Sequence, residues 1–178
     1  SASLVGSEMC IRDRYDDAYP VWAFVEIITL GRFVDFYGFC AKRFADRDMM
    51  DNYYNLLTCK KIRNASAHNN CILNDLKART STNVTNASIT AKLMTIQGMN
   101  MNFRKNRMSN ARIQQIVILF YLHKTMVESD GIRKAAEDEL QKLMGRVNKH
   151  QEYYLSNSMI SSTFNFLKLV VDNWFKTA

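Results

Sequence analysis

YYNLLTCKKIRNASAHNNCILNDLK, residues 53–77, holds the densest group of chemically capable side chains in the sequence. Apolar residues recur at spacings of three to five on both sides of its polar centre, RNASAH, and this spacing predicts a helix through the whole stretch. They are Tyr53, Leu56, Leu57 and Ile62 before the centre and Cys71, Ile72 and Leu76 after it. We therefore expect Arg63, Asn64 and His68 to project from a helix.

The spacing of these three residues limits how they can act together. On an ideal helix Asn64 and His68 lie one turn apart on one face, whereas Arg63 and His68 diverge by about 140°. Three arrangements would bring the arginine and the histidine to one ligand. The long arginine reaches around the helix, the helix kinks, or a second copy of the chain supplies the missing half at a dimer interface.

The chemistry of the three side chains suits cleavage of a phosphodiester without a metal ion. Histidine exchanges protons near neutrality, with an ordinary pKa of about 6.5, and arginine offers a fixed fork of donors to phosphate. His68 would be the general base, Arg63 would hold the phosphate and its developing charge, and Asn64 would orient one of them. The alternative is a surface arginine and a histidine that caps a helix, because short motifs often occur by chance.

The residues RNASAHNNCILNDL, preceded by YPVWAFVEIITLGRFVDFY, closely resemble the abortive-infection (Abi-like) family of bacterial defence proteins, a branch of the HEPN superfamily. The resemblance covers approximately residues 19–76. It implies an all-α fold, a HEPN-type helical bundle of about five to six helices, which forms a homodimer. It also implies metal-independent RNA cleavage through an Arg-polar-x3-His motif, so that Arg63, Asn64 and His68 are the catalytic residues. Asn69, Asn70 and Asn74 match the polar run that is usual in the family.

The net charge of +7 is concentrated around this motif. Residues 59–112 contain ten lysines and arginines against one acid, Asp75. Such a concentration is typical of a protein that binds a phosphate backbone, although a solvated basic face is the alternative. We expect RNA contacts from Lys60, Lys61, Asn69, Asn70, Lys77, Arg79, Arg104, Lys105 and Arg107.

Composition indicates one helical globular domain. The chain has 178 residues, 47% of them hydrophobic, and a single proline. Its four cysteines show no CxxC pairing, and we expect reduced thiols in the cytoplasm rather than a zinc site or disulfides. No metal-ligand cluster or Gly-rich phosphate loop is present, so we expect neither a metal nor a cofactor. Residues 1–14 resemble translated sequencing-adapter sequence, so we expect them to be non-native or disordered. We expect residues 15–178 to form one domain that is truncated at the N-terminus relative to the family.

The remaining helices follow from periodicity and from helix-terminal residues. Pro20 should open a long helix to Phe44 that is buried on several sides, and its charged residues argue against a membrane span. Within it Glu26 is either a catalytic helper or, as we expect, a partly buried carboxylate paired with an arginine. Further helices are predicted over 88–97, 108–128, 132–150 and 157–176.

Two other segments are expected to lack regular structure. Residues 79–86 form a Ser/Thr/Asn loop, and residues 98–107 form an irregular basic arm that contacts RNA or is a mobile loop. His123 lies on the apolar face of its helix, which predicts a hydrogen-bonded core histidine rather than a catalyst.

Together these features predict an endoribonuclease that acts in phage defence or as a toxin. The RNA 2′-OH would attack the adjacent phosphate. The partners would be RNA and a second copy of the chain, with no membrane. A non-cleaving module that holds a structured, guide or antitoxin RNA is the first alternative, and a truncated protein that only dimerises is the second.

Overall fold

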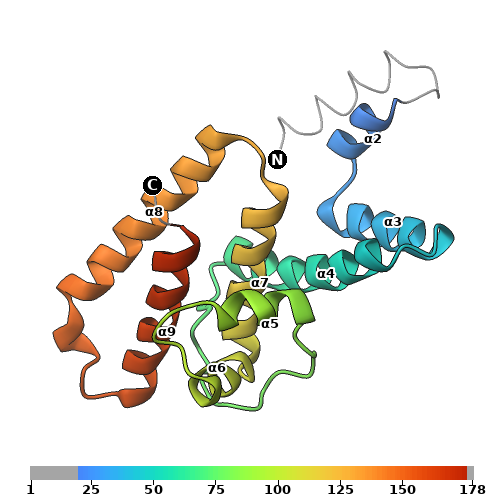
Figure 1. The fold of residues 1–178 in the computed structure, drawn as a ribbon. Coiled ribbons are helices and arrows are strands. Elements are labelled where there is room, and N and C mark those ends of the chain that lie inside the picture. Colours follow the sequence, from blue (N-terminus) through green and yellow to red (C-terminus); the bar gives the residue numbers. More distant parts are fainter. Residues whose placement is uncertain (1–19, 176–178) are drawn as a thin grey trace. The chain divides into compact units, whose positions relative to one another are not determined.

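The computed structural model describes residues 20–175, and this part of the chain is helical, without strands (Figure 1). It contains eight α-helices, so the all-α expectation is confirmed and the expected number of five to six was too low. The helices are α2 (Val21–Ile27), α3 (Leu30–Arg43), α4 (Arg47–Ala67), α5 (Ala87–Met94), α6 (Met101–Met108), α7 (Ala111–Met126), α8 (Asp130–Lys149) and α9 (Ser158–Trp174). A short 3-10 turn, η1 (Gln151–Tyr153), joins α8 to α9.

The chain divides into two compact units, residues 1–54 and residues 55–178. Helix α4 begins in the first unit, and its second half belongs to the second unit. The expectation of one domain over residues 15–178 stays a prediction. In the part of the chain that the structure describes, no helix combines the length and the apolar character needed to cross a bilayer.

The helix expected from Pro20 to Phe44 is interrupted, so that prediction was wrong. Helix α2 ends at Ile27, the backbone of Ile28 and Thr29 is extended, and α3 begins at Leu30. The Thr29 hydroxyl accepts a hydrogen bond from the backbone N–H of Arg32 at 3.4 Å, which caps α3. Threonine is among the residues that favour this position. The apolar pattern runs through the break because Ile27 and Ile28 suit either a helix or an extended segment.

Helix α3 is buried along one stripe rather than on several sides, which also differs from the expectation. Val34, Gly38 and Ala41 are buried, whereas Phe36 is 45% exposed and Phe39 is 62% exposed. Gly38 faces the ring of Tyr53, and a Cβ atom built on this glycine would lie 2.5 Å from Cε2 of that ring. Glycine at position 38 therefore permits the close approach of α3 to the first half of α4.

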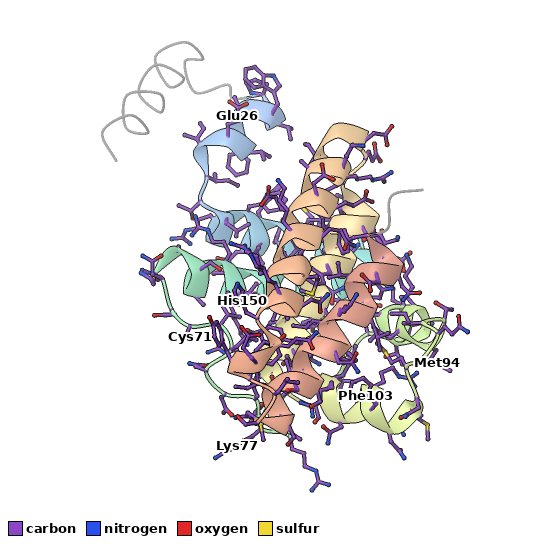
Figure 2. The ribbon with its side chains drawn as sticks, turned by 90° about the vertical axis from the view of Figure 1, so that its left-hand side faces the viewer. Glu26, Cys71, Lys77, Met94, Phe103 and His150 are labelled. Atoms are coloured by element: carbon purple, nitrogen blue, oxygen red, sulfur yellow. The ribbon has the colours of Figure 1, made fainter. Side chains whose placement is uncertain are left out.

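Glu26 does not have the environment expected of a structural carboxylate. Its side chain is exposed, and it forms no ion pair within residues 20–175 (Figure 2). The expected partial burial was therefore wrong, and the expected arginine partner is not found within residues 20–175.

The core of the second unit lies around α7 and α9, which run side by side (Figure 1). Helix α6 contacts both of them, and α8 packs on α9. The largest fully buried side chains include Phe166, Ile113, Val117 and Val170, drawn from the facing stripes of α7 and α9. The predicted helices over 108–128, 132–150 and 157–176 correspond to α7, α8 and α9, with ends that differ by up to three residues.

Residues 98–107 are mostly helical, so the expectation of an irregular arm was wrong. The side-chain oxygen of Asn100 accepts a hydrogen bond from the backbone N–H of Phe103 at 2.8 Å and caps α6. The ring of Phe103 packs edge-on against Phe166 with ring centroids 5.5 Å apart. This aromatic contact joins α6 to the core.

His123 lies on the core side of α7 as expected. It is half-buried, and its ring centroid is 5.8 Å from that of Phe175. Its Nδ1 atom is buried and has no hydrogen-bond partner in the described residues, so the expected hydrogen bond is not found at that atom.

Candidate functional site

The second half of α4 attaches the segment that carries Arg63, Asn64 and His68 to the core. Asn55, Thr58 and Ile62 are buried at spacings of three and four, so one face of the helix packs inward. Leu56 and Cys59 pack against the hydrophobic core from the edge of that face. Arg63 follows Ile62 and is exposed. Core packing therefore fixes the helix and leaves Arg63 on the surface.

Helix α4 ends at Ala67, so the predicted continuation toward Leu76 was wrong. The backbone N–H of Asn70 donates to the carbonyl of Ala65 at 2.9 Å, and the N–H of Asn69 donates to the carbonyl of Ser66 at 3.1 Å. Asn69 has a φ of +52°. This pair of bonds with one left-handed residue is a Schellman motif, in which His68 is the helix cap. Asn69 thus has a structural role that sequence reasoning missed.

Arg63, Asn64 and His68 are all exposed at this end of α4. Nη1 of Arg63 donates a long hydrogen bond, 3.3 Å, to the side-chain oxygen of Asn64. The backbone N–H of His68 donates to the carbonyl of Asn64 at 3.1 Å, which places Asn64 one turn before the histidine. The His68 ring makes no hydrogen bond within residues 20–175. Asn64 therefore links the other two: it contacts Arg63 through its side chain and precedes His68 by one helical turn.

The loop after α4 is attached to the start of α7. Nδ2 of Asn110 donates to the carbonyls of Asp75 at 2.9 Å and Lys77 at 2.8 Å. The backbone N–H of Arg79 donates to the hydroxyl of Ser109 at 3.0 Å. The side chains of Lys77 and Arg79 are exposed. Both cations are thus presented by a loop whose backbone is held in place.

The structure separates the basic residues that the sequence placed together. Figure 2 shows Cys71 and Lys77 on one side of the second unit and Met94 and Phe103 on the other. Among the predicted RNA contacts, the exposed ones are Lys61, Asn69, Asn70, Lys77, Arg79 and Lys105, while Lys60 is half-buried. On α6, Arg104 is only 9% exposed and Arg107 is half-buried. These two arginines are turned into the fold rather than displayed on an arm.

The other reactive side chains near the segment are the cysteines. Burial raises the pKa of the Cys59 thiol from 9.0 to about 11, so this group is a neutral thiol at physiological pH. Cys71 is exposed beyond the end of α4. Residues 20–175 contain no group of three or more His, Cys, Asp or Glu side chains arranged to hold a metal ion.

Part of the chain that includes this site is similar to a known protein family. Residues 7–74 match the family model of Abi-like proteins. The match supports the resemblance to that family over α2, α3, α4 and the residues that follow as far as Asn74. It begins within residues 1–14, the segment attributed to adapter sequence, which lies outside the described residues. No curated protein and no solved structure matches the chain. Membership of the HEPN superfamily stays a prediction.

Proposed function

We propose that this chain is a metal-independent endoribonuclease of an Abi-like phage-defence or toxin system. The observation that carries the proposal is the exposure of Arg63, Asn64 and His68 at the end of a helix whose opposite face is packed in the core. These three polar residues lie inside the stretch that matches the Abi-like family. Because they contribute little to packing, they are free to bind a ligand or take part in chemistry without a cost to the fold.

The proposed reaction is an attack of the RNA on its own backbone. His68 accepts the proton of a 2′-OH, and the resulting oxygen forms a bond to the adjacent phosphorus. The bond from phosphorus to the 5′-oxygen breaks, and that oxygen takes a proton from a general acid. The products are a 2′,3′-cyclic phosphate and a 5′-OH. Arg63, held beside Asn64, compensates the negative charge that develops on the phosphate oxygens.

The same step favours a homodimer. A single neutral histidine accepts a proton but has none to donate to the leaving oxygen in the same step. A second copy of the chain supplies a protonated His68 if the two segments face each other across a two-fold axis. Lys61, Lys77 and Arg79 would then bind the RNA backbone on either side of the cut.

Cleavage of end-labelled RNA by the purified full chain tests the proposal. We expect His68→Ala and Arg63→Ala to abolish cleavage while leaving the helical circular dichroism and the oligomeric state unchanged. His150→Ala is the matched control and should retain activity. His150 follows the C-terminal end of α8 and stacks on Tyr153, outside the proposed site. Cleavage should persist in EDTA. Activity that disappears with chelator and returns with Mg²⁺, or that survives His68→Ala, would refute the mechanism.

A mixed dimer tests whether the site is shared. In isolated heterodimers of wild-type and His68→Ala chains, a shared site retains only one of its two histidines, so most activity should be lost. Half of the wild-type rate would show instead that each protomer works alone.

RNA binding by the exposed basic residues without cleavage is the second candidate function. The ordered loop that carries Lys77 and Arg79 favours it, because both cations are held in place before any ligand binds. A gel shift that depends on these two residues, together with intact RNA after long incubation, would support this function over cleavage.

A further inference from the structure

A cavity of about 330 Å³ lies between the end of α8 and the first half of α9. Its lining comes from α8, from η1 and the two residues after it, and from α9, all of which belong to the second unit. Helix α8 packs on α9, so the packing within this unit defines the cavity. The volume is at the lower end of the range that is typical of small-molecule sites, about 300–1,000 Å³.

One side of the cavity is fixed by contacts within the protein. The Tyr154 hydroxyl donates to the carbonyl of Val147 at 2.5 Å, and the Ser161 hydroxyl donates to the carbonyl of Tyr154 at 2.9 Å. The rings of Tyr154 and Phe164 are in contact, with centroids 5.0 Å apart and an angle of 52° between their planes. All four residues line the cavity. This aromatic side is therefore formed before any ligand binds.

Three amide side chains that line the cavity are unused. Asn148, Gln151 and Asn165 are exposed, and none of their side chains makes a hydrogen bond within residues 20–175. Other asparagines of the second unit have clear structural partners, since Asn110 and Asn157 cap helices with their side-chain oxygens. An amide offers two N–H donors and a carbonyl acceptor. The cavity thus has several donors and acceptors available to a ligand.

The cavity is electrically balanced. Lys168 is the only residue in its lining with a charged side chain, and its Nζ atom lies 2.6 Å from Oδ2 of Asp172, one turn further along α9. No unpaired charge in the lining is available to a phosphate or a carboxylate. Aromatic side chains and unused amides suit instead a neutral ligand with apolar faces and hydrogen-bonding groups at its edge.

We propose that this cavity binds a nucleobase, either that of a free nucleoside or an unpaired base of an RNA strand. The faces of a base are apolar, and its edge carries donors and acceptors that side-chain amides can match in pairs. Proteins that recognise single-stranded RNA combine such edge contacts with aromatic side chains that support the unstacked base. The RNA source rests on the proposed function, whereas the nucleoside source does not.

The test is a calorimetric titration of the full chain with adenosine, guanosine, cytidine and uridine, and with ribose as the sugar without a base. We expect saturable binding of at least one nucleoside and none of ribose. Gln151→Met and Asn165→Leu keep the approximate size of the side chain but remove its amide. Each should weaken binding by about fivefold or more, because the edge of the base loses a hydrogen-bond partner.

Asn173→Leu is the matched control. Asn173 is an exposed asparagine of the same helix that does not line the cavity, and its side-chain nitrogen donates to the carbonyl of Leu169 at 2.8 Å. This variant should bind the nucleoside with less than a twofold change in affinity. Circular dichroism checks that all three variants are folded, which we expect because the three positions are exposed.

A further arm identifies the source of the base. The affinity for single-stranded RNA is measured with His68→Ala chains, which should not cut it, with and without Gln151→Met. Weaker RNA binding in the double variant indicates a base of RNA, whereas weaker nucleoside binding with unchanged RNA affinity indicates a free nucleoside. Nucleoside binding by a chain that does not cleave RNA would refute the proposed function alone.

Two results would overturn the nucleobase proposal. The first is that no nucleoside binds saturably and the amide variants bind RNA as tightly as their parent. The second is that ribose binds as tightly as the nucleosides, or that Asn173→Leu loses as much affinity as Gln151→Met.

Discussion

Substitutions of Asn69 can show whether this residue has a structural role or a ligand-binding role at the proposed active site. It is the left-handed residue of the Schellman motif that ends α4, with a φ of +52°, and it directly follows His68. A residue with a Cβ atom costs about 1–2 kcal/mol in this conformation, less for asparagine, and glycine avoids the cost. Asn69→Ala should therefore lower the free energy of unfolding by about 1 kcal/mol. Asn69→Gly should change it by no more than about 0.5 kcal/mol, because the added freedom of the unfolded chain offsets the relief.

Ala45 provides a matched comparison in the first unit. It occupies the equivalent position at the end of α3, with a φ of +51°, and Asp46 and Ala45 donate to the carbonyls of Ala41 and Lys42. The wild-type alanine already carries the conformational cost of a positive φ. Ala45→Gly should therefore raise the free energy of unfolding by about 0.5–1 kcal/mol. Urea unfolding followed by circular dichroism measures all three variants.

Activity then distinguishes the two roles of Asn69. If the residue only ends the helix, Asn69→Gly retains cleavage and RNA binding, because the backbone that carries His68 is unchanged. If its amide contacts RNA, the glycine variant loses binding as severely as the alanine variant despite its normal stability. That second result would refute the assignment of Asn69 to the helix end alone.

The remaining predictions concern packing and pH. Phe166→Ala should lower the free energy of unfolding by about 3–5 kcal/mol in urea, because this ring is fully buried, and a loss below 1 kcal/mol would contradict its central position. Gly38→Ala should cost about 1–3 kcal/mol by forcing the Tyr53 ring away, whereas Gly145→Ala on α8 has nothing within 4 Å and should gain up to about 1 kcal/mol; equal effects would refute the close approach. Because the Cys59 thiol has a pKa raised from 9.0 to about 11, the native state binds its proton more firmly, so its contribution to stability should be lost as the pH rises through this range. Cys59→Ala should reduce the slope of the free energy of unfolding against pH in this range. An unchanged slope would show that other groups cause the pH dependence.

The helices that were predicted well from the sequence have a strong periodicity of apolar residues. Helices α7, α8 and α9 each carry a regular apolar stripe, and α7 and α9 begin after an asparagine that caps them, Asn110 and Asn157. The predictions failed where a local hydrogen bond outweighed the pattern. Thr29 interrupts a continuous apolar run, and Asn100 starts α6 in a segment whose many Asn, Arg and Lys residues suggested irregular structure.

The exposure of the candidate site residues was predicted from the sequence, but the geometry of the segment that carries them was not. Arg63, Asn64 and His68 are exposed at one end of α4 as the motif indicated. The helix was expected to continue because Cys71, Ile72 and Leu76 imitate helical spacing, although Asn69 tolerates the left-handed conformation that stops it. The direction of the α6 arginines could not be read from the sequence, because α6 is too short for its periodicity to define a buried face.

The hydrogen bonds of the Asn110 side chain couple the start of α7 to the loop after α4 during local unfolding of the second unit. Its oxygen accepts the N–H of Ile113 and caps α7, while its nitrogen donates to the carbonyls of Asp75 and Lys77. The residue is 2% exposed, so neither set of bonds can be exchanged for water without exposing the other. Fraying of α7 and release of the loop after α4 are therefore one cooperative event. The backbone of this loop should be resistant to proteases, like the helix start that holds it, even though its side chains face solvent.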